Sequence, residues 1–379
     1  MPIRTLTLQE LRRDLAIRDL TDPEDGAHAI QLIVDQAVDA LSSWRCEVRR
    51  IRANPVVSAA DNYDRLRIDT EAVSRETRYT RYVGEGLMLR SHTSVMIPPA
   101  LRDLAQRPSK DVLLACAGMV YRRDSIDRLH SGTPHQLDLW RVRERPPLTV
   151  TDLDEMVDRL VGTLTPGRPH RSLSREHPYT THGRQVDVQI GSEWVEIAEC
   201  GLAHPEVLAD AGLRPWTGLA MGLGLDRLLM IRKGVPDIRL LCLNDRRIAS
   251  QMLDLEPYRE VSSYPPIRRH LSIAVGATDD AEELGDRVRV ALGQNSQSVE
   301  TIRVLSETST AELPASAVER LGLRPGQKNV LLEVVLRDLE RTLTDEDANQ
   351  LRNRIYESLH QGDTTEGNSE HKATTSENG

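Results

Sequence analysis

The sequence has 379 residues, of which 39% are hydrophobic and 28% are charged, and this length and composition suit an ordinary soluble protein with two domains. Its formal net charge of −9 argues against a generic nucleic-acid coat protein, but a local basic face could still meet RNA. No apolar run approaches the roughly 20 residues that span a bilayer, and the amino terminus lacks a secretory signal, so we expect a cytoplasmic protein.

The four cysteines are scattered, with no close pair, which excludes a CxxC metal site and provides no disulfide framework. The chain also contains no phenylalanine, which a sequence of this length would not lack by chance. Leu, Ile, Val, Tyr and Trp must therefore build its hydrophobic cores.

The first part of the chain is predicted to be helical, over residues 5–20 and 27–41. In the second segment, apolar residues recur with i, i+3, i+4, i+7 spacing, so that one face is apolar. A basic cluster follows, made of Arg45, Arg49, Arg50 and Arg52. We interpret this cluster as a solvated strand edge in preference to an RNA contact.

The middle of the chain is predicted to consist mainly of strands. Apolar runs of strand length between polar loops indicate strands, whereas helical periodicity indicates helices. The predicted elements are a strand over 111–121, a strand over 135–142, a helix over 152–164, a Pro- and Arg-rich loop over 165–178, a hairpin of 186–190 and 193–199 turning at Gly191 and Ser192, and a glycine-rich segment that continues as an apolar helix over 217–232.

After a Tyr-Pro-Pro linker at 264–266, the pattern resets to strand, helix, strand, strand, helix, an order that suits a ferredoxin-like α/β sandwich. The last helix is predicted to start at Thr344, with Asp347 three residues on in a capping-box arrangement. The other elements are an alternating strand at Leu271, Ile273 and Val275, a helix over 281–292, and strands over 299–305 and 330–336.

The residues best suited to a charged substrate flank the loop between the strands 111–121 and 135–142. Gln136 and Asp138 alternate onto one face of the second strand, where an amide and a carboxylate could hold an ammonium group. Arg122 ends the first strand and could hold a phosphate or carboxylate bidentately. By composition alone, a surface salt-bridge network is the favoured explanation of the same residues.

The stretch VYRRDSIDRLHSGTPHQLDLW at 120–140 resembles motif 2 of phenylalanyl-tRNA synthetases. The matches are VYR, the acidic pair of Asp124 and Asp127, then His130, and finally HQ at 135–136. The resemblance implies that Arg122 binds the α-phosphate of ATP and the amino-acid carboxylate. It places Asp124 and His130 in the ATP site, and it brings Gln136 and Asp138 to the substrate's ammonium group.

This stretch also departs from the family. Asp138 stands for its glutamate, Leu139 for its glycine and Pro134 for its phenylalanine, which puts the size of the pocket in doubt but not its polarity.

Two further segments extend the resemblance. LMLRSHTSV at 87–95 is similar to the family's LLRTHTS, which implies that His92, Thr93 and Ser94 line the amino-acid site. NYDRLRI at 62–68 is similar to NFDALNI, with tyrosine in place of phenylalanine.

GLAMGLGLDRLLMIRKGVPDIR at 218–239 resembles motif 3 of the same family. Gly222 and Gly224 permit close backbone approach to a ligand. The resemblance implies that Arg227 stacks on adenine and contacts the γ-phosphate. It also implies that Ala220 forms the floor of the side-chain pocket.

The segment 177–201 is similar to the family's amino-acid clamp, but His177 and Tyr179 stand at the two aromatic positions that normally hold a phenyl ring. Glu196 and Asp187 are carboxylates that could hold Mg²⁺ bridging the phosphates, since this hard cation prefers oxygen ligands. Glu199 takes the place of a family glycine and adds charge near the site.

Residues 264–360 resemble the ferredoxin-fold anticodon-binding domain of the family. Positions 265–360 hold 12 Lys/Arg and 16 Asp/Glu, a net charge of −4, so only a local face could meet RNA. The candidates for that face are Arg268, Arg269 and Lys328, and a merely solvated face explains them equally well.

The predicted fold is thus α+β, with a class II synthetase antiparallel sheet flanked by helices and a ferredoxin-like sandwich. We predict four parts: an N-terminal helical segment over 1–54, the catalytic core over 55–256, an anticodon-binding domain over 264–360 and a disordered tail over 361–379. The single-chain order implies a monomer or homodimer that requires no separate β subunit.

The implied activity is ATP- and Mg²⁺-dependent activation of phenylalanine, or of a phenylalanine-like or modified aromatic amino acid, and its transfer to tRNA, with the phenylalanine acceptor as the expected partner. His177 and Tyr179 offer polar groups that phenylalanine cannot satisfy. However, a chain purged of phenylalanine also needs substitutes at such positions, as Tyr63 illustrates.

Two other functions stay open at this point: a catalytically silent paralogue that binds tRNA or amino acid, and an adenylating enzyme with an acceptor other than tRNA. The missing phenylalanine further suggests that the protein is made when the tRNA for phenylalanine is uncharged or wrongly charged.

Overall fold

The computed structural model describes residues 5–72, 75, 80–123, 125–261 and 264–363. The chain divides into two compact units, one of residues 1–123 and 128–261 and one of residues 124–127 and 262–379. None of the helices in the described ranges is both long and apolar enough to cross a membrane.

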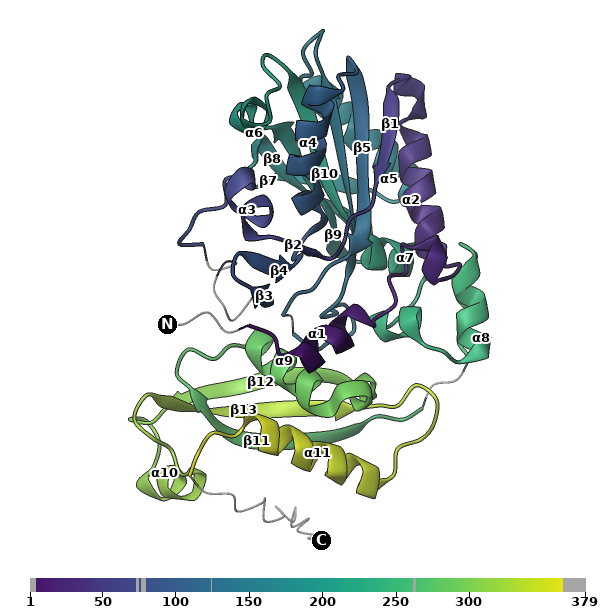
Figure 1. The fold of residues 1–379 in the computed structure, drawn as a ribbon. Helices are drawn as coiled ribbons and strands as arrows, with labels where there is room; N and C mark the ends of the chain where they lie inside the picture. Colours follow the sequence, from purple (N-terminus) through teal and green to yellow (C-terminus); the bar gives the residue numbers. More distant parts are fainter. Residues whose placement is uncertain (1–4, 73–74, 76–79, 124, 262–263, 364–379) are drawn as a thin grey trace. The chain divides into compact units, whose positions relative to one another are not determined.

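The first unit is built on a seven-stranded sheet with the order β1-β5-β6-β10-β9-β8-β7 (Figure 1). The edge strand β1 runs parallel to β5, and every other neighbouring pair is antiparallel. The strands are β1 (Glu47–Ile51), β5 (Asp111–Met119), β6 (His135–Arg143), β7 (His170–Ser174), β8 (Thr180–Ile190), β9 (Glu193–Ala203) and β10 (Thr217–Gly224).

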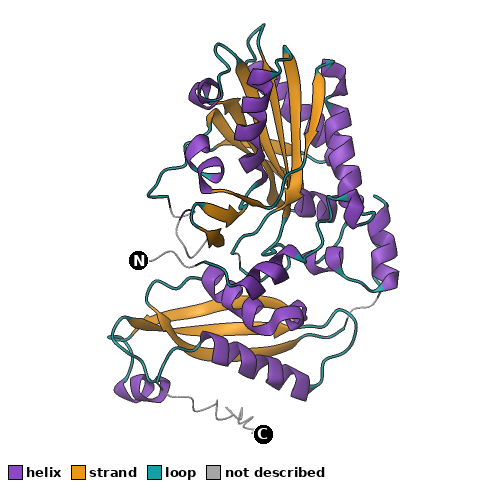
Figure 2. Ribbon diagram, in the orientation of Figure 1, coloured by secondary structure: helices purple, strands orange, loops and turns teal. Residues whose placement is uncertain are grey.

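Helices cover both faces of this sheet, as Figure 2 shows. On one face, α4 packs with α6 over β5, β6 and β10 around the fully buried Trp140. On the other face, α2 packs against α5 and α7. The helices are α1 (Leu8–Leu15), α2 (Ala29–Ala40), α3 (Ala59–Asn62), α4 (Ile97–Gln106), α5 (Val150–Leu164), α6 (Pro205–Asp210), α7 (Leu225–Lys233) and α8 (Arg246–Ala249).

A small three-stranded sheet, with the order β2-β4-β3, precedes α4 in the chain. Its strands are β2 (Val56–Ser58), β3 (Tyr82–Gly84) and β4 (Leu87–Leu89), and all pair antiparallel. The chain leaves β4 and enters the 3₁₀ turn η5 (Thr93–Met96), which leads directly into α4.

The second unit has an antiparallel sheet with the order β11-β13-β12. Its elements are β11 (Ile267–Gly276), α9 (Ala281–Leu292), β12 (Val299–Ser309), α10 (Ala315–Leu321), β13 (Gln327–Leu336) and α11 (Asp345–Leu359). Apart from the short helix α10, this is the predicted order. At the start of α11, Thr344 and Asp347 form the expected capping box.

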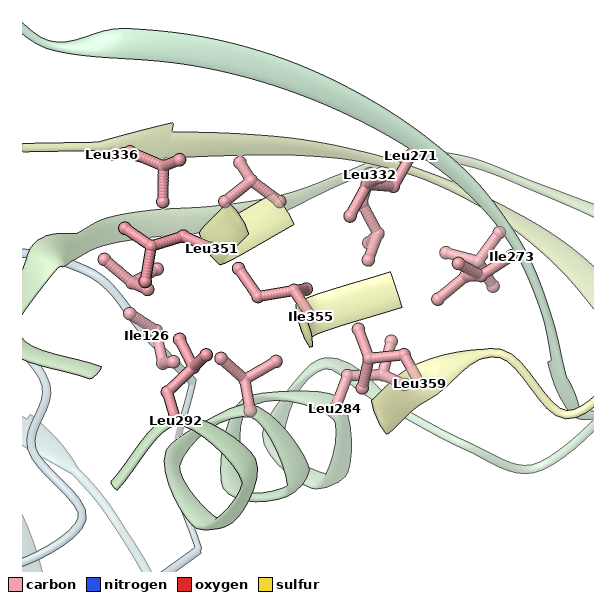
Figure 3. Packing of buried hydrophobic residues seen from close by; sticks show 14 of the residues in the cluster. Ile126, Leu271, Ile273, Leu284, Leu292, Leu332, Leu336, Leu351, Ile355 and Leu359 are labelled. Carbon is pink, nitrogen blue, oxygen red and sulfur yellow. The ribbon is translucent and has the colours of Figure 1, made fainter. Parts of the chain in front are cut away.

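The core of the second unit lies between its sheet and the helices α9 and α11 (Figure 3). Alternate residues of β11, namely Leu271, Ile273 and Val275, contribute to it, as their spacing predicts. Ile126, from the four-residue segment assigned to this unit, is 7% exposed within the same cluster. The described residues of the second unit form a sheet of three strands, so the assignment of this unit as ferredoxin-like stays a prediction.

Two predictions about the elements need correction. The first helix covers only Leu8–Leu15, because its capping box at Thr7 sets the start and Ala16 ends it. The predicted loop over 165–178 contains strand β7, which pairs with β8. The predicted N-terminal segment contributes strand β1 to the main sheet, where Val48 pairs with Leu113.

The predicted basic cluster lies partly on β1. This strand carries Arg49 and Arg50 at the sheet edge, where they pair with Glu47 and Asp35, as a solvated strand edge would.

Most of the predicted tail, residues 364–379, lies outside the described residues. Gln361 donates its backbone N–H to Ala274 of β11 at 2.8 Å.

Candidate active site

The register of three neighbouring strands gathers the predicted polar residues on one face of the main sheet. Asp138 of β6 lies beside Gly222 of β10, and Gly222 lies beside Glu199 of β9. One pleat further, Gln136 lies beside Gly224. Since cross-strand partners point to the same side and strands are about 4.8 Å apart, Asp138 and Glu199 stand on either side of a glycine, about 10 Å apart along the sheet.

The two glycines leave the centre of this face open. A Cβ atom at Gly222 would lie 3.9 Å from both carboxylate oxygens of Asp138, and one at Gly224 would meet nothing within 4 Å. Neither glycine has a positive φ, so the backbone conformation does not demand glycine at either position. Their effect is therefore to leave space where a ligand can approach the strand.

Asp138 is held by the segment that enters α4. The hydroxyl of Thr93 donates to one carboxylate oxygen at 2.6 Å, and that of Ser94 donates to the other at 2.9 Å. The backbone N–H of Thr93 donates to Oε1 of Gln136 at 3.3 Å. Burial raises the pKa of Asp138 to about 6, although both hydroxyl groups act to lower it. These groups together can bind an ammonium group.

Arg122 follows β5 and belongs to the same site. Its Nε donates to the carbonyl of Ser91 at 2.8 Å, and its side chain is exposed. Burial raises the pKa values of Asp138 and Tyr179, and His177 lowers that of Glu199; the positive charge of Arg122 makes a smaller, lowering contribution to all three. A guanidinium that acts on all three groups can neutralise a substrate carboxylate or phosphate beside them.

His92 has two buried ring nitrogens that meet no partner in hydrogen-bonding geometry among the described residues, although the backbone of Asn62 lies near enough to act on its pKa. Burial, and secondarily the charge of Arg122, lowers the pKa of His92 to about 4. The ring is thus neutral at physiological pH. A buried polar group without a partner is unfavourable unless a ligand or a water satisfies it, which marks His92 as part of a binding site.

Aromatic rings line the face beyond Asp138. Tyr179 stacks on Trp140 with ring centroids 6.1 Å apart, and His177 stacks on Tyr179 at 6.0 Å. Ala220 of β10 is the cross-strand partner of Trp140 and is buried. The residues predicted for the clamp and the pocket floor therefore lie in one cluster, and Trp140, which the sequence did not single out, is its buried end.

A chain of polar groups borders this stack. Nδ1 of His177 lies 3.3 Å from the hydroxyl of Thr180, and its Nε2 lies 3.3 Å from Oε2 of Glu199. Arg175 is 3.7 Å from the other oxygen of Glu199. His177 first, and then Arg175, holds the pKa of Glu199 below its usual range despite burial. The Glu199 carboxylate is therefore ionised at neutral pH.

Arg227, the third residue of α7, reaches the strand β9. Its Nη1 donates to the backbone carbonyl of Glu196 at 2.9 Å. The pKa of the Glu196 carboxyl is raised by burial and then by the neighbouring Glu199, although Arg227 acts to lower it. An arginine at the start of a helix, beside carboxylates that crowd one another, suits a polyphosphate and a divalent cation.

The predicted metal ligands differ in how well they fit Mg²⁺. Asp187 is the cross-strand partner of Glu196, but Arg171 donates to one of its oxygens at 2.9 Å and Gln185 donates to the other at 2.8 Å. Both carboxylate oxygens of Asp187 thus have partners within the protein, and its role as a metal ligand stays a prediction. No group of three or more His, Cys, Asp or Glu suited to a metal occurs in the described part of the chain. Glu196 fits such a cation only together with phosphate and water oxygens.

Two predicted ATP-site residues stay predictions. Asp124 lies outside the described residues. His130 is half-buried in the loop that connects β5 and β6.

A buried pair that the sequence did not single out fixes the start of β6. Asp226 of α7 accepts the backbone N–H of His135 and lies 2.9 Å from its Nδ1, while Nε2 of the same ring accepts the backbone N–H of Leu20. Asp226 opposes the effect of burial and raises the pKa of His135. In the sequence, the only sign of this pair was the position of its members: His135 stands in the stretch that resembles motif 2, and Asp226 directly precedes Arg227 in the stretch that resembles motif 3.

Comparison with known proteins shows which proteins this chain resembles. Residues 13–252 match the family model described as "tRNA synthetases class II core domain (F)". The phenylalanine--tRNA ligase alpha subunit of Prochlorococcus marinus (strain MIT 9313) is 33% identical over 241 residues, which are 62% of this chain and 69% of that protein.

Organellar relatives match a longer part of the chain. The chloroplastic/mitochondrial phenylalanine--tRNA ligase of Arabidopsis thaliana is 26% identical over 81% of this chain and 70% of its own length. The probable mitochondrial phenylalanine--tRNA ligase of Drosophila melanogaster is 26% identical over 80% of this chain and 75% of its own. Because residues 1–261 are about 69% of 379, both matches include part of the second unit.

Proposed function

The chain belongs to the (F) family of class II tRNA synthetases, and from that membership we propose that it activates an aromatic amino acid with ATP and transfers it to tRNA. The observation that carries the proposal is the single sheet face with Asp138 beside the open Gly222, with Arg122 close enough for its charge to act on Asp138. The helical flanks and antiparallel-rich sheet are those of the class II synthetase fold.

In the first step, the amino acid binds over the open Gly222 and Gly224, beside their cross-strand neighbours Asp138 and Gln136. Its ammonium group pairs with Asp138 and Gln136, and the unpartnered ring of His92 is available as a further acceptor. The carboxylate lies next to Arg122 and attacks the α-phosphorus of ATP, so that pyrophosphate leaves. Held in line beside a fixed positive charge, the reacting groups need no side-chain nucleophile.

The triphosphate is bound at the start of α7, where Arg227 neutralises its charge. Mg²⁺, when bound, supplies further neutralisation of the phosphates, and Glu196 is the residue that would hold it. Arg227 and Glu196 are joined through the Glu196 carbonyl, so the strand β9 and the helix α7 position both groups together.

In the second step, a terminal ribose hydroxyl of tRNA attacks the carbonyl carbon of the aminoacyl adenylate, forming the ester as AMP leaves. The matches of organellar ligases into the second unit support the proposal that this unit serves the tRNA and that one chain suffices without a β subunit. Its candidate RNA-binding residues are engaged in ion pairs, of Arg268 with Glu333, of Arg269 with Asp345 and of Lys328 with Glu307. An RNA phosphate would have to compete with these carboxylates.

ATP–pyrophosphate exchange across a panel of aromatic amino acids, followed by charging of the phenylalanine acceptor tRNA, tests the proposal. We expect exchange with at least one of them, and a loss of roughly 100-fold or more in kcat/KM for Arg122→Ala, because removal of one preorganised charge-stabilising group has that magnitude. Arg107→Ala, an exposed arginine of α4's end, is the matched control.

Two other outcomes separate the alternatives. Absence of exchange with every amino acid would identify a catalytically silent paralogue, for which the altered clamp residues His177 and Tyr179 are the only favouring observation. Exchange without charging would point to an acceptor other than tRNA. Size-exclusion chromatography with light scattering of the purified chain decides between monomer and homodimer.

A further inference from the structure

The strongest unexplained feature of the site is the charge beside its aromatic stack. Glu199 is an ionised carboxylate, and its side chain is only 34% exposed. It lies in the same row as Asp138, which is already suited to the ammonium group. The bound amino acid would therefore meet a second carboxylate, about two strand spacings from the first.

The surroundings of Glu199 show which part of the substrate it faces. His177, its partner at 3.3 Å, stacks on Tyr179, and Tyr179 stacks on Trp140. The charge of Glu199 also contributes, after burial and Asp138, to the raised pKa of Tyr179. The carboxylate thus lies at the border of the aromatic pocket, where the substrate's ring, not its ammonium group, is held.

His177 reinforces this border. Its Nε2 is buried and, although it lies 3.3 Å from Glu199, it meets no acceptor in hydrogen-bonding geometry within the described ranges. Its Nδ1 is 3.3 Å from the hydroxyl of Thr180. A plain phenyl ring would remove water from these groups without offering a hydrogen bond, which is unfavourable for a buried polar group and more so for a charge.

We propose that Glu199 and His177 are specificity-determining residues that select an aromatic amino acid whose ring carries a hydrogen-bond donor, a phenolic hydroxyl or an amino group, over phenylalanine. This inference rests on the proposed adenylation at the same site. The absence of phenylalanine from the chain accounts for His177 and Tyr179 equally well, but not for Glu199, which stands where the family resemblance has glycine.

The arrangement also limits how the donor is recognised. A ring hydroxyl donates a hydrogen bond to Glu199, and its oxygen can accept a hydrogen bond from His177. No bond is made or broken in this recognition. The discrimination arises because phenylalanine offers neither group a hydrogen bond, and a site lined by polar groups rejects the analogue that lacks the donor.

The test measures ATP–pyrophosphate exchange by the full chain with phenylalanine and with its 2-, 3- and 4-hydroxy derivatives. We expect one hydroxy isomer to exceed phenylalanine by at least about tenfold in kcat/KM. Glu199→Gln should reduce that ratio by at least about tenfold, and Glu199→Gly should favour phenylalanine. Glu193→Gln, an exposed glutamate on the same strand β9, should leave the ratio unchanged.

Calorimetric binding of the corresponding amino alcohols provides a second readout that does not require adenylation. If no amino acid supports exchange, the proposed function fails, whereas a preference of binding for a hydroxylated ring that is lost in Glu199→Gln would still support the specificity assignment. A wild-type preference for phenylalanine, or a ratio unaffected by both Glu199 variants with unchanged melting temperatures, would overturn it.

Discussion

At the scale of single residues, the site depends on the carboxylate of Asp138, whose ionised form is disfavoured by its burial in the fold. Asp138 is 3% exposed, and its raised pKa means that burial disfavours its charged form. The hydroxyls of Thr93 and Ser94 offset only part of that effect. A charge that is kept despite this cost is explained by the ammonium group it binds.

Replacing Asp138 by asparagine should separate stability from activity. With a pKa of about 6 in the folded chain against 3.8 in the reference state, ionisation of Asp138 opposes folding above pH 6, by up to about 3 kcal/mol, and has no effect below pH 4. Asp138→Asn should therefore raise the melting temperature at pH 7.5, and the gain should disappear as the pH falls to 4. A destabilised variant at pH 7.5 would contradict this account.

The same variant should have lower activity and should lose a pH dependence that the wild type shows. The wild-type kcat/KM for the amino acid should fall as the pH drops below about 6, because protonated Asp138 cannot pair with an ammonium group. Asp138→Asn should lower kcat/KM by roughly 10- to 100-fold at neutral pH, as expected for a lost charged hydrogen bond, and should lack that acidic limb.

At the scale of elements, strand β10 contributes to the site by what it lacks. Gly222 lies between Asp138 and Glu199 without a requirement for positive φ, whereas Gly201 on the adjacent strand β9 is in close contact with Thr180 and Thr181. Glycines on neighbouring strands of the same face thus serve different ends. One leaves space for a ligand, and the other permits close packing.

Alanine substitutions should distinguish these two glycines. Gly222→Ala should keep or raise stability, by up to about 1 kcal/mol, since the added Cβ has no contact nearer than 3.9 Å, yet it should raise the KM of the amino acid. Gly201→Ala should destabilise the chain by about 1–3 kcal/mol, because its Cβ would lie 2.7 Å from Cβ of Thr180. Equal losses of stability in chemical denaturation would refute the distinction.

At the scale of the whole molecule, the chain has built two cores without phenylalanine. Tyr63 shows the consequence: its ring is 1% exposed, and its hydroxyl needed a partner, which it finds 2.6 Å away at Thr80. The largest fully buried side chain is Trp140, and leucine, isoleucine and valine supply most of the rest. Phenylalanine is thus absent even from positions with room for an aromatic ring.

This composition predicts that synthesis of the protein does not depend on charged phenylalanine tRNA. In a reconstituted translation system without phenylalanine, the wild-type chain should be completed, while the matched variant Tyr63→Phe should stop at residue 63. In cells, expression should persist during phenylalanine starvation. If it fell as steeply as that of ordinary proteins, the absence of phenylalanine would have no such meaning.

Local patterns predicted much of this molecule correctly. The capping box of Thr344 and Asp347, the hairpin turn at Gly191 and the alternation around Ile273 are all present, because caps, turns and side-chain alternation depend on residues close in sequence. Motif order in the sequence likewise indicated the family. The length of the helix Leu8–Leu15 was missed because its ends are set by the capping box at Thr7 and by Ala16, and strand β7 was missed because all five of its residues are exposed and show no apolar alternation.

Only the tertiary structure decided how distant residues combine. It places Glu199 in a row with Asp138 through the register of β6, β10 and β9, and it brings Arg171 to within 2.9 Å of Asp187. Strand register and long-range ion pairs arise from segments far apart in the chain, so no local pattern encodes them. The sequence by itself determined most of the elements and the family, whereas the polarity of the pocket border followed from this non-local pairing.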